Sequence, residues 1–166
     1  MSRTRGVAAA GTALFFALAP GVVAGLVPWL LTGWRVGADL GPVLRVLGVA
    51  LIAGGATVLV RAFARFVTEG IGTPSPTAPT EHLVVGGLYR WVRNPMYLGV
   101  LAAIAGQALL LGRAVLAAYG LLVAAAVVTF VKAYEEPTLR ARFGAEYDAY
   151  VRDVPGWLPR PPRRRA

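Results

Sequence analysis

The chain has 166 residues, a length typical of one domain, and 57% of them are hydrophobic while only 15% are charged, which places it among membrane proteins. The absence of cysteine excludes a disulfide framework, a thiol nucleophile and a thiolate metal site, and a single histidine argues against a zinc centre, so we expect no metal. The net charge of +9 comes from basic residues at the ends of apolar runs, which indicates membrane topology and not nucleic-acid binding.

Long apolar runs, in which charged residues occur only near the two ends of the second and at the end of the fourth, predict an all-α integral membrane protein, a single membrane domain over residues 1–166 with about four transmembrane helices. The spans are expected at residues 7–31, 42–66, 95–112 and 114–132. The first run begins like a signal peptide, with basic residues before an apolar stretch, but it continues apolar well beyond the length of such a peptide. We therefore expect it to be a membrane anchor.

Proline and glycine residues shape the first span. Pro20 and Pro28 are expected to kink or end its helix. Gly21 and Gly25 have the small-xxx-small spacing that permits close helix contact. Packing alone explains all four residues, so they indicate no chemistry.

Residues 67–94 form a loop between the second and third spans, called here the motif loop. Its stretch rich in Pro, Ser and Thr at residues 68–80 excludes a regular helix and is typical of a linker. Residues 82–87 then combine an apolar triplet with a double glycine, which predicts a short extended piece and a turn. A polar, aromatic and basic run follows at residues 88–99, in which Asn94-Pro95 is expected to begin the third span.

The connection between the third and fourth spans is Arg113 alone, which predicts an antiparallel helix pair. That pair returns Glu135 and Glu136 to the side of the membrane on which the motif loop lies. All but three of the 17 basic residues then lie on this side. The positive-inside rule therefore places the motif loop, both termini and residues 133–166 in the cytoplasm. We expect the membrane to be the cell (inner or plasma) membrane.

Residues 133–166 change in character from the spans before them. Leu139, Phe143, Tyr147 and Tyr150 recur at helical spacing and predict an amphipathic helix that lies against the membrane or the helix bundle. Three consecutive arginines at residues 163–165 form a basic tail suited to anionic lipid headgroups, so membrane lipids are expected partners.

Each charged residue near the motif loop has a plain structural explanation. Glu135 and Glu136 are either a solvated helix end or need cationic or hydroxyl partners, which Arg90, Arg93 or a ligand would supply. The two arginines flank a span and are typical of topology and lipid anchors. His82 alone is typical of a solvated loop. No GxGxxG follows a strand, and GxxxxGK[ST], GxSxG and HExxH motifs are absent, so the common nucleotide-binding and hydrolase motifs are missing.

Two blocks of sequence, taken in order and spacing, resemble the isoprenylcysteine carboxyl methyltransferase and phospholipid methyltransferase superfamily in its bacterial form. The first is LVVGGLYRWVRNPMYLG at residues 83–99, and the second runs through Glu135, Glu136, Leu139, Phe143, Gly144, Tyr147, Tyr150 and Val154-Pro155. GTPSP at residues 72–76 extends the likeness over roughly residues 68–160. Asn94 stands where the eukaryotic carboxyl methyltransferases have histidine, a departure that concerns the prenylcysteine substrate and not the methyl transfer.

The resemblance implies an S-adenosylmethionine-dependent methyltransferase whose cofactor is bound without a Rossmann domain, in a pocket on the cytosolic side capped by the C-terminal segment. The family's cofactor contacts fall on His82, Leu83, Val84, Val85, Tyr89, Asn94, Pro95, Met96, Tyr97 and Glu135. The acceptor would be lipophilic: the carboxylate of a prenylated or other lipid-like molecule, or a phospholipid amine. Glu136 and Arg90 are the candidates for a catalytic role, and an amine nucleophile would need a proton acceptor such as Glu136 or His82.

Two other classes of protein remain as alternatives. An NADPH-dependent membrane reductase of the sterol type has a related C-terminal architecture, but its Pro-Asn-Tyr-x-Gly-Glu pattern is not met, because Met96 and Val100 occupy the asparagine and glutamate positions. A non-enzymatic assembly or transport protein would need a polar path through the spans. Their polar residues are few, among them Thr57, Gln107 and Thr129.

Overall fold

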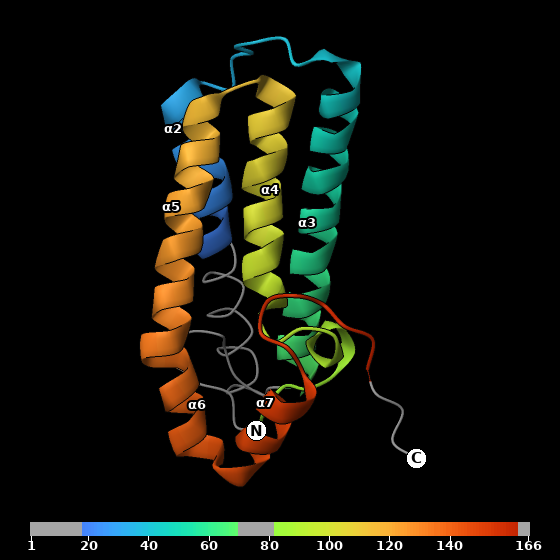
Figure 1. Ribbon diagram of the computed structural model, residues 1–166, viewed down its shortest axis with the longest axis vertical. Coiled ribbons are helices and arrows are strands. Elements are labelled where there is room, and N and C mark those ends of the chain that lie inside the picture. Colours follow the sequence, from blue (N-terminus) through green and yellow to red (C-terminus); the bar gives the residue numbers. More distant parts are fainter. Residues whose placement is uncertain (1–17, 70–81, 163–166) are drawn as a thin grey trace, which may run out of the picture. The chain divides into compact units, whose positions relative to one another are not determined.

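The computed structural model describes residues 18–69 and 82–162, and in this part every regular element is a helix (Figure 1). The elements are η1 (Val22–Leu26), α2 (Val27–Thr32), α3 (Gly41–Glu69), η2 (Gly87–Arg90), α4 (Pro95–Leu111), α5 (Ala114–Phe130), η3 (Val131–Glu135), α6 (Glu136–Phe143) and α7 (Ala145–Asp153). Four expectations lie wholly or partly outside the described residues: the first part of the 7–31 span, the linker at 68–80, the GTPSP sequence at 72–76 and the basic tail at 163–165. Of the linker, only Thr68 and Glu69 are described, and they belong to the last turn of α3 instead of an irregular segment.

The chain divides into two compact units, each of which is described by itself. The bundle unit comprises Ala17–Leu59 and Met96–Thr129, and the motif unit comprises Met1–Phe16, Val60–Pro95 and Phe130–Ala166. Two continuous helical stretches, Gly41–Arg65 and Ala114–Phe143, are long and apolar enough to cross a membrane. The apolar helices Leu18–Thr32 and Pro95–Leu111 are shorter.

The bundle unit turns many large apolar side chains outward. Val43, Leu121 and Leu122 are 77%, 74% and 68% exposed. Exposed apolar surface of this kind is costly in water and ordinary against lipid. The buried apolar residues include Ala108 and Leu111 of α4 with Leu116 of α5, which form one cluster.

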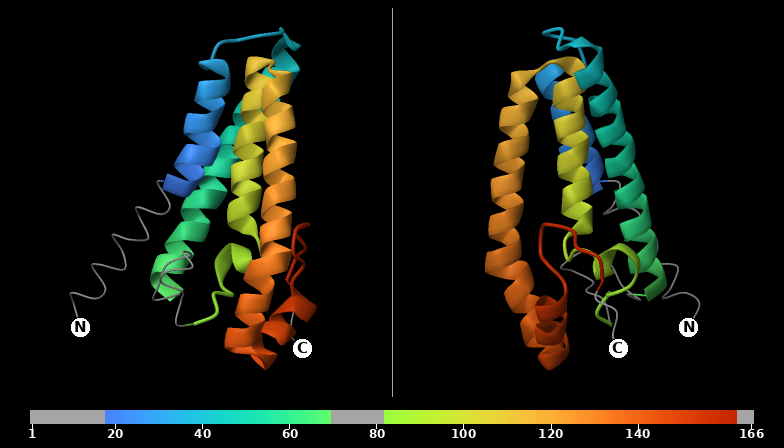
Figure 2. Two further views of the ribbon diagram at one scale, coloured as in Figure 1. Left: turned by 90° about the vertical axis from the view of Figure 1, so that its left-hand side faces the viewer. Right: turned by 45° about the vertical axis from the view of Figure 1, so that its right-hand side comes forward.

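Four glycines bring α3 and α4 into backbone contact in the bundle unit (Figures 1 and 2). A Cβ on Gly48 would lie 2.7 Å from the carbonyl oxygen of Gly106, and a Cβ on Gly106 would lie 2.6 Å from that of Gly48. Gly55 and Gly99 form the same reciprocal pair, at 2.6 and 2.9 Å. The two glycines of each helix are seven residues apart, so they lie on one face, and the two helices are antiparallel. Only a residue without a side chain permits this approach.

The glycines predicted to make such a contact are different ones. Within the described residues, a Cβ on Gly21 or Gly25 would meet nothing within 4 Å. The expectation of a close helix contact there is therefore wrong for this part of the chain. The four-residue spacing of Gly21 and Gly25 permits close helix packing, but a contact forms only where that face of the helix meets another helix.

Both π-helical segments precede a proline by the same distance. Val22–Leu26 ends two residues before Pro28, and Val131–Glu135 ends two residues before Pro137. A proline has no N–H for the carbonyl four residues earlier, and its ring crowds that carbonyl. The helix accommodates this by one wide π turn and continues. Pro28 thus distorts the first helix without ending it.

The first π segment gains two hydrogen bonds from neighbouring helices of the bundle unit. Gln107 Nε2 donates to the carbonyl oxygen of Ala24 at 2.7 Å, which is the carbonyl that Pro28 leaves without a helical donor. The Tyr119 hydroxyl donates to the Val23 carbonyl oxygen at 2.8 Å. Gln107 Oε1 in turn accepts from Trp34 Nε1 at 3.2 Å. The polar side chains of α4 and α5 therefore satisfy the backbone of a distorted helix.

The other polar residues of the apolar helices bond within their own helix. The hydroxyl groups of Thr57 and Thr129 each donate to the carbonyl oxygen four residues earlier, at 2.8 Å in both cases. Together with Gln107, they have structural partners, and none of the three marks a polar path.

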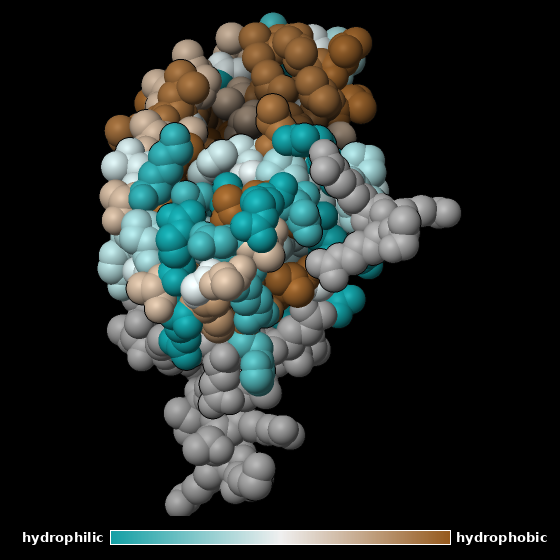
Figure 3. All heavy atoms as spheres, turned by 60° about the horizontal axis from the view of Figure 1, so that its bottom comes forward, coloured by the Kyte–Doolittle hydropathy of each residue, from teal (hydrophilic) through white to brown (hydrophobic). Residues whose placement is uncertain are grey.

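The C-terminal amphipathic pattern forms two helices instead of one. α6 ends at Phe143, and α7 begins at Ala145 after Gly144, whose φ is 52°. This left-handed conformation favours glycine and turns the chain. Viewed from the side of α6 and α7, the motif unit presents mostly hydrophilic side chains (Figure 3).

Candidate functional site

The first part of the candidate site is the irregular segment before η2. Residues 82–85 adopt no regular structure, so the expected extended piece is not part of a sheet in the described chain. Val84 is buried, whereas His82 and Val85 are exposed. Among the described residues, the backbone groups of residues 82–85 make no hydrogen bond. These groups are therefore available to a ligand.

The double glycine forms the turn that the sequence predicts. Gly87 has φ of 57°, and a Cβ on it would lie 2.8 Å from Arg65 Nε. Both the backbone conformation and the close approach of the Arg65 side chain require glycine here. η2 then places Tyr89 in the interior of the motif unit, with only 6% of its surface exposed.

Residues 154–160, called here the C-terminal segment, hold the end of the motif loop by three hydrogen bonds. The backbone N–H of Arg93 donates to the Pro155 carbonyl oxygen at 2.9 Å, and that of Arg160 donates to the Trp91 carbonyl oxygen at 3.0 Å. Asn94 Nδ2 donates to the Gly156 carbonyl oxygen at 3.1 Å. Asn94 is 6% exposed, so this amide bond lies inside the motif unit.

Two tyrosines of α7 pack against the same loop. The Tyr150 hydroxyl donates to the Tyr89 carbonyl oxygen at 2.7 Å. Tyr147 is almost completely buried. Burial raises the pKa of both phenols, most strongly that of Tyr150, so both hydroxyl groups are neutral at physiological pH.

An ion pair joins the two sequence blocks. Arg93 Nη1 lies 3.2 Å from Glu136 Oε1, and the two side chains are only 16% and 26% exposed. The helix pair thus returns Glu136 to the motif loop, and of the surroundings that the sequence left open for it, the structure shows pairing with Arg93. Burial is the largest cause of the raised pKa of Tyr147. The negative charges of Glu136 and Glu135 raise this pKa further, and the positive charge of Arg93 lowers it, as expected for groups that lie near the Tyr147 hydroxyl.

The Arg93 guanidinium also has unused hydrogen-bonding capacity. Its Nε is buried and has no hydrogen-bond partner within the described part of the chain, and the Nη1 contact with Glu136 is an ion pair without hydrogen-bond geometry. A Cβ on Gly156 would lie 3.0 Å from Arg93 Nη2, so glycine is needed where the C-terminal segment passes the guanidinium. Arg93 is therefore an interior residue and not the lipid anchor that its position beside a span suggested.

The Arg93–Glu136 ion pair joins the two sequence blocks that resemble a known superfamily, and comparison with known proteins tests that resemblance. The family model described as Phospholipid methyltransferase matches residues 42–146, more than half of the chain. The chain belongs to this family. No curated protein and no solved structure matches it significantly.

Membership of the phospholipid methyltransferase family confirms the resemblance stated from the sequence. The matched range contains the motif loop from its start through Asn94, and both Glu135 and Glu136. It ends at residue 146, before Tyr147, Tyr150 and the C-terminal segment. The residues that close the motif loop thus lie beyond the family match.

The residues predicted to contact the cofactor differ in their surroundings. Four are buried: Val84, Tyr89, Asn94 and Pro95. Leu83, Met96, Tyr97 and Glu135 are partly buried, and His82 and Val85 are exposed. Met96 and Tyr97 lie in the first turn of α4 and belong to the bundle unit, whereas the other eight belong to the motif unit.

The two candidates for a catalytic role also differ. Glu136 is half-buried in the ion pair with Arg93. Arg90 is exposed at the end of η2 and forms no ion pair with any described residue. The structure therefore brings Glu136, and not Arg90, to the interior group formed with Arg93 and Tyr147.

Sequence reasoning did not identify Pro155, Gly156 and Arg160 as site residues. They bind the motif loop through backbone N–H and C=O groups, which every residue carries, so no residue type in the sequence indicates this role. Val154-Pro155 in the second block was the one available indication, and it was read only as part of the resemblance.

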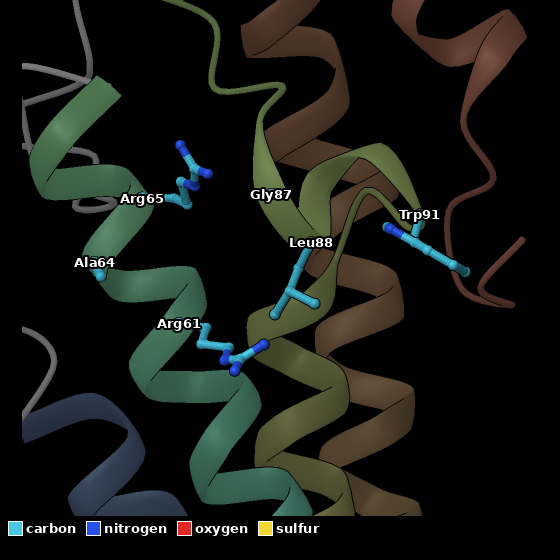
Figure 4. Close-up of a pocket in the computed structure, with 6 residues that line it drawn as sticks. All are labelled: Arg61, Ala64, Arg65, Gly87, Leu88 and Trp91. Atoms are coloured by element: carbon cyan, nitrogen blue, oxygen red, sulfur yellow. The ribbon is translucent and has the colours of Figure 1, made fainter. Parts of the chain in front are cut away.

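A hollow of about 710 Å³ lies beside the motif loop and is lined by none of the predicted cofactor contacts. Its walls are Arg61, Ala64 and Arg65 of α3, with Gly87, Leu88 and Trp91 opposite (Figure 4).

Proposed function

We propose that this protein transfers a methyl group from S-adenosylmethionine to a lipid-like acceptor at the surface of the cell membrane. The observation that carries the proposal is the Arg93–Glu136 ion pair, because it joins the two sequence blocks that define the likeness to methyltransferases. The family is one of phospholipid methyltransferases, which favours a lipid acceptor over a soluble one.

The residues of the motif unit fit the chemical groups of S-adenosylmethionine. The backbone groups of residues 82–85, which make no hydrogen bond among the described residues, suit the donor and acceptor edge of adenine. The Glu135 carboxylate suits ribose hydroxyls or the amino group, and the buried Arg93 Nε suits a carboxylate. When bound, the cofactor supplies an electrophilic methyl group on a sulfonium sulfur.

The protein's own contribution would be alignment and exclusion of water. In-line displacement needs the acceptor atom, the methyl group and the sulfur in a row, and rigid positioning provides this. The three hydrogen bonds from the C-terminal segment and the Tyr150 hydroxyl fix the motif loop for that purpose. We assign Glu136 a positioning role, in which its ion pair holds the Arg93 guanidinium in place. A carboxylate acceptor needs no base, whereas an amine acceptor must first lose a proton.

We further propose that Leu18–Thr32 and Pro95–Leu111 cross the membrane together with the two longer helices, in a single membrane domain with the motif loop, residues 133–166 and both termini in the cytoplasm. The exposed leucines and valines of the bundle unit and the internal satisfaction of its polar groups support membrane insertion. The distribution of basic residues supports the orientation.

Calorimetric titration of the purified protein in detergent tests the proposed cofactor. S-adenosylmethionine should give saturable heat, and NADPH should give none. Heat with NADPH alone would favour a membrane reductase, and heat with neither would favour a non-enzymatic protein. Incubation of the enzyme with lipid extracts and radiolabelled cofactor would then identify the acceptor and distinguish a methyl ester from a methylated amine.

Glu135→Ala should weaken S-adenosylmethionine binding by about 10- to 100-fold, because a charge-assisted hydrogen bond contributes roughly 1.5–3 kcal/mol. Calorimetric Kd values measure the effect, and the folded yield should not change. Glu146→Ala is the matched control, since Glu146 is an exposed glutamate in the first turn of α7. Equal affinity in the Glu135→Ala protein and the wild type would move the cofactor site elsewhere.

Pro137→Ala should restore the helical hydrogen bond that the proline removes and favour an α-turn over the π segment Val131–Glu135. The change redirects Glu135, so S-adenosylmethionine binding should weaken about tenfold even though alanine is the better helix former by roughly 3 kcal/mol. Pro28→Ala removes the other π-forming proline and should leave the Kd unchanged. A Kd unaffected by Pro137→Ala would show that the π turn is not needed to orient Glu135.

A further inference from the structure

The motif unit exposes apolar side chains where the C-terminal segment meets the motif loop. Leu158 is 79% exposed, more than any other large apolar side chain of the described chain, and Trp91 is 45% exposed. Pro159 and Pro161 are exposed as well. These four residues are called here the apolar patch. Exposed apolar side chains that gather in one place indicate a contact surface, whereas single ones do not.

Backbone hydrogen bonds bring the two parts of the patch together. The Arg93 N–H donates to the Pro155 carbonyl oxygen, and the Arg160 N–H donates to the Trp91 carbonyl oxygen, so the two stretches of chain run antiparallel. Leu158 lies between these two bonds along the C-terminal segment, two residues before Arg160. A partner that holds the Leu158 side chain therefore also restrains the motif loop.

The backbone of the C-terminal segment suits the interfacial layer of a membrane. Irregular backbone enters such a layer at a cost, because its N–H groups lose water as a hydrogen-bond partner. Three of residues 159–162 are prolines, which have no N–H. The fourth is Arg160, whose N–H is bonded to the Trp91 carbonyl oxygen at 3.0 Å. Insertion of residues 159–162 would therefore leave no N–H of theirs without a partner.

The patch also lies close to the expected membrane boundary. The apolar helix α4 begins at Pro95, four residues after Trp91. Four residues of extended chain reach about 14 Å at most, so Trp91 lies within that distance of the start of the helix. Tryptophan is enriched at the level of the lipid headgroups, and long arginine side chains reach that level from below it. Arg90 and Arg160, next to patch residues in the sequence, are both exposed.

We infer that the apolar patch inserts into the interfacial layer of the bilayer and that this insertion holds the motif loop against the C-terminal segment. The partner is the bilayer surface as a whole. Leu158 and Trp91 enter it by burial of apolar area, whatever the headgroup, so no particular lipid is recognised. This insertion depends on the proposed membrane topology and not on the proposed methyl transfer.

Spin labelling in phosphatidylcholine nanodiscs tests the insertion, and the absence of cysteine means that one introduced cysteine carries one label. Electron paramagnetic resonance compares collisions of the label with oxygen, which concentrates in lipid, and with a water-soluble nickel chelate. The label of L158C should favour oxygen, as should that of L121C, at a position 74% exposed on the apolar helix α5. The label of E146C, at an exposed position of α7, should favour the nickel chelate.

Each other result of this comparison has a distinct meaning. An L158C label that favours the nickel chelate, as the E146C label does, overturns the insertion. An L158C label shielded from both reagents indicates a protein partner and overturns it as well. If the L121C label also favours the nickel chelate, the proposed membrane topology fails, and the insertion fails with it.

Hydrogen exchange in the same nanodiscs tests the link to the motif loop. L158D should speed exchange of the Arg93 and Arg160 amides about tenfold, because the charged side chain does not enter the interfacial layer. L158I keeps the apolar side chain and should exchange as the wild type does. Leu158 is 79% exposed, so L158D removes little packing within the protein.

The Asp148 amide, bonded to the Gly144 carbonyl oxygen in the same unit, is the internal control and should exchange at the wild-type rate in both variants. Unchanged exchange of the Arg93 and Arg160 amides in L158D would show that insertion does not hold the motif loop. Faster exchange at Asp148 as well would mean general loosening of the unit and would also overturn the link.

Discussion

Gly55→Ala should lower the free energy of unfolding by about 1–3 kcal/mol, whereas Gly54→Ala should raise it by roughly 0.5–1 kcal/mol. The added Cβ of the first variant would lie 2.6 Å from the Gly99 carbonyl oxygen, so α3 and α4 must move apart. The Cβ of the second meets nothing within 4 Å among the described residues and only improves helix propensity. Unfolding in detergent, followed by circular dichroism, measures both values.

The adjacent glycines form a matched pair because they share a helix, a residue type and a substitution. If Gly54→Ala destabilised the protein as much as Gly55→Ala, the reciprocal glycine contact would not be the cause. A second check is the combination of Gly55→Ala with Gly99→Ala. Once one substitution has separated the helices, the other should cost less than it does alone, so the two changes should not be additive.

Arg93→Ala should have the largest effect on the candidate site. It removes the partner of a half-buried carboxylate and leaves Glu136 without a described cation, at a cost of about 2–4 kcal/mol to the free energy of unfolding. Methyl transfer should fall by at least about 100-fold, because the motif loop and the glutamates lose their connection. Unfolding measurements and transfer of a radiolabelled methyl group to lipid extract give the two values.

Arg90→Ala is the control for this substitution, since Arg90 lies three residues earlier and is exposed without an ion pair in the described structure. Its effect on unfolding should be within about 0.5 kcal/mol. Arg93→Ala combined with Glu136→Ala should cost less than the sum of the two single changes, because the pair is then removed as a unit. Additive costs would mean that the ion pair does not stabilise the protein.

The sequence predicted the features that depend on local pattern or on short connections. Long apolar runs placed helices close to α3, α4 and α5, and the single-residue connection at Arg113 predicted that the glutamates after α5 return to the motif loop. Pairing with an arginine was one of the alternatives that the sequence left open, and Arg93 is the arginine that pairs with Glu136. Gly86-Gly87 predicted a turn because few other residues adopt its backbone conformation.

Other features depend on which faces meet, and the sequence does not contain that information directly. Gly48 and Gly55 are seven residues apart and Gly21 and Gly25 four apart, and either spacing places two glycines on one helix face, so spacing alone does not show which pair meets another helix. The periodicity of the C-terminal helix continues across Gly144, so the break there was missed. The position of Arg93 beside a span is typical of a lipid anchor, and the sequence does not indicate that its side chain is mostly buried.

The order of elements along the chain has a consequence for biosynthesis. The C-terminal segment, which donates or accepts three hydrogen bonds at the motif loop, follows all the apolar helices in the sequence. During synthesis the motif loop therefore emerges well before its closing partners. On the proposed topology, α4 and α5 enter the membrane while the loop is still open. We therefore expect a nascent chain halted after α5 to be inserted in the membrane but to lack the closed motif loop of the proposed site.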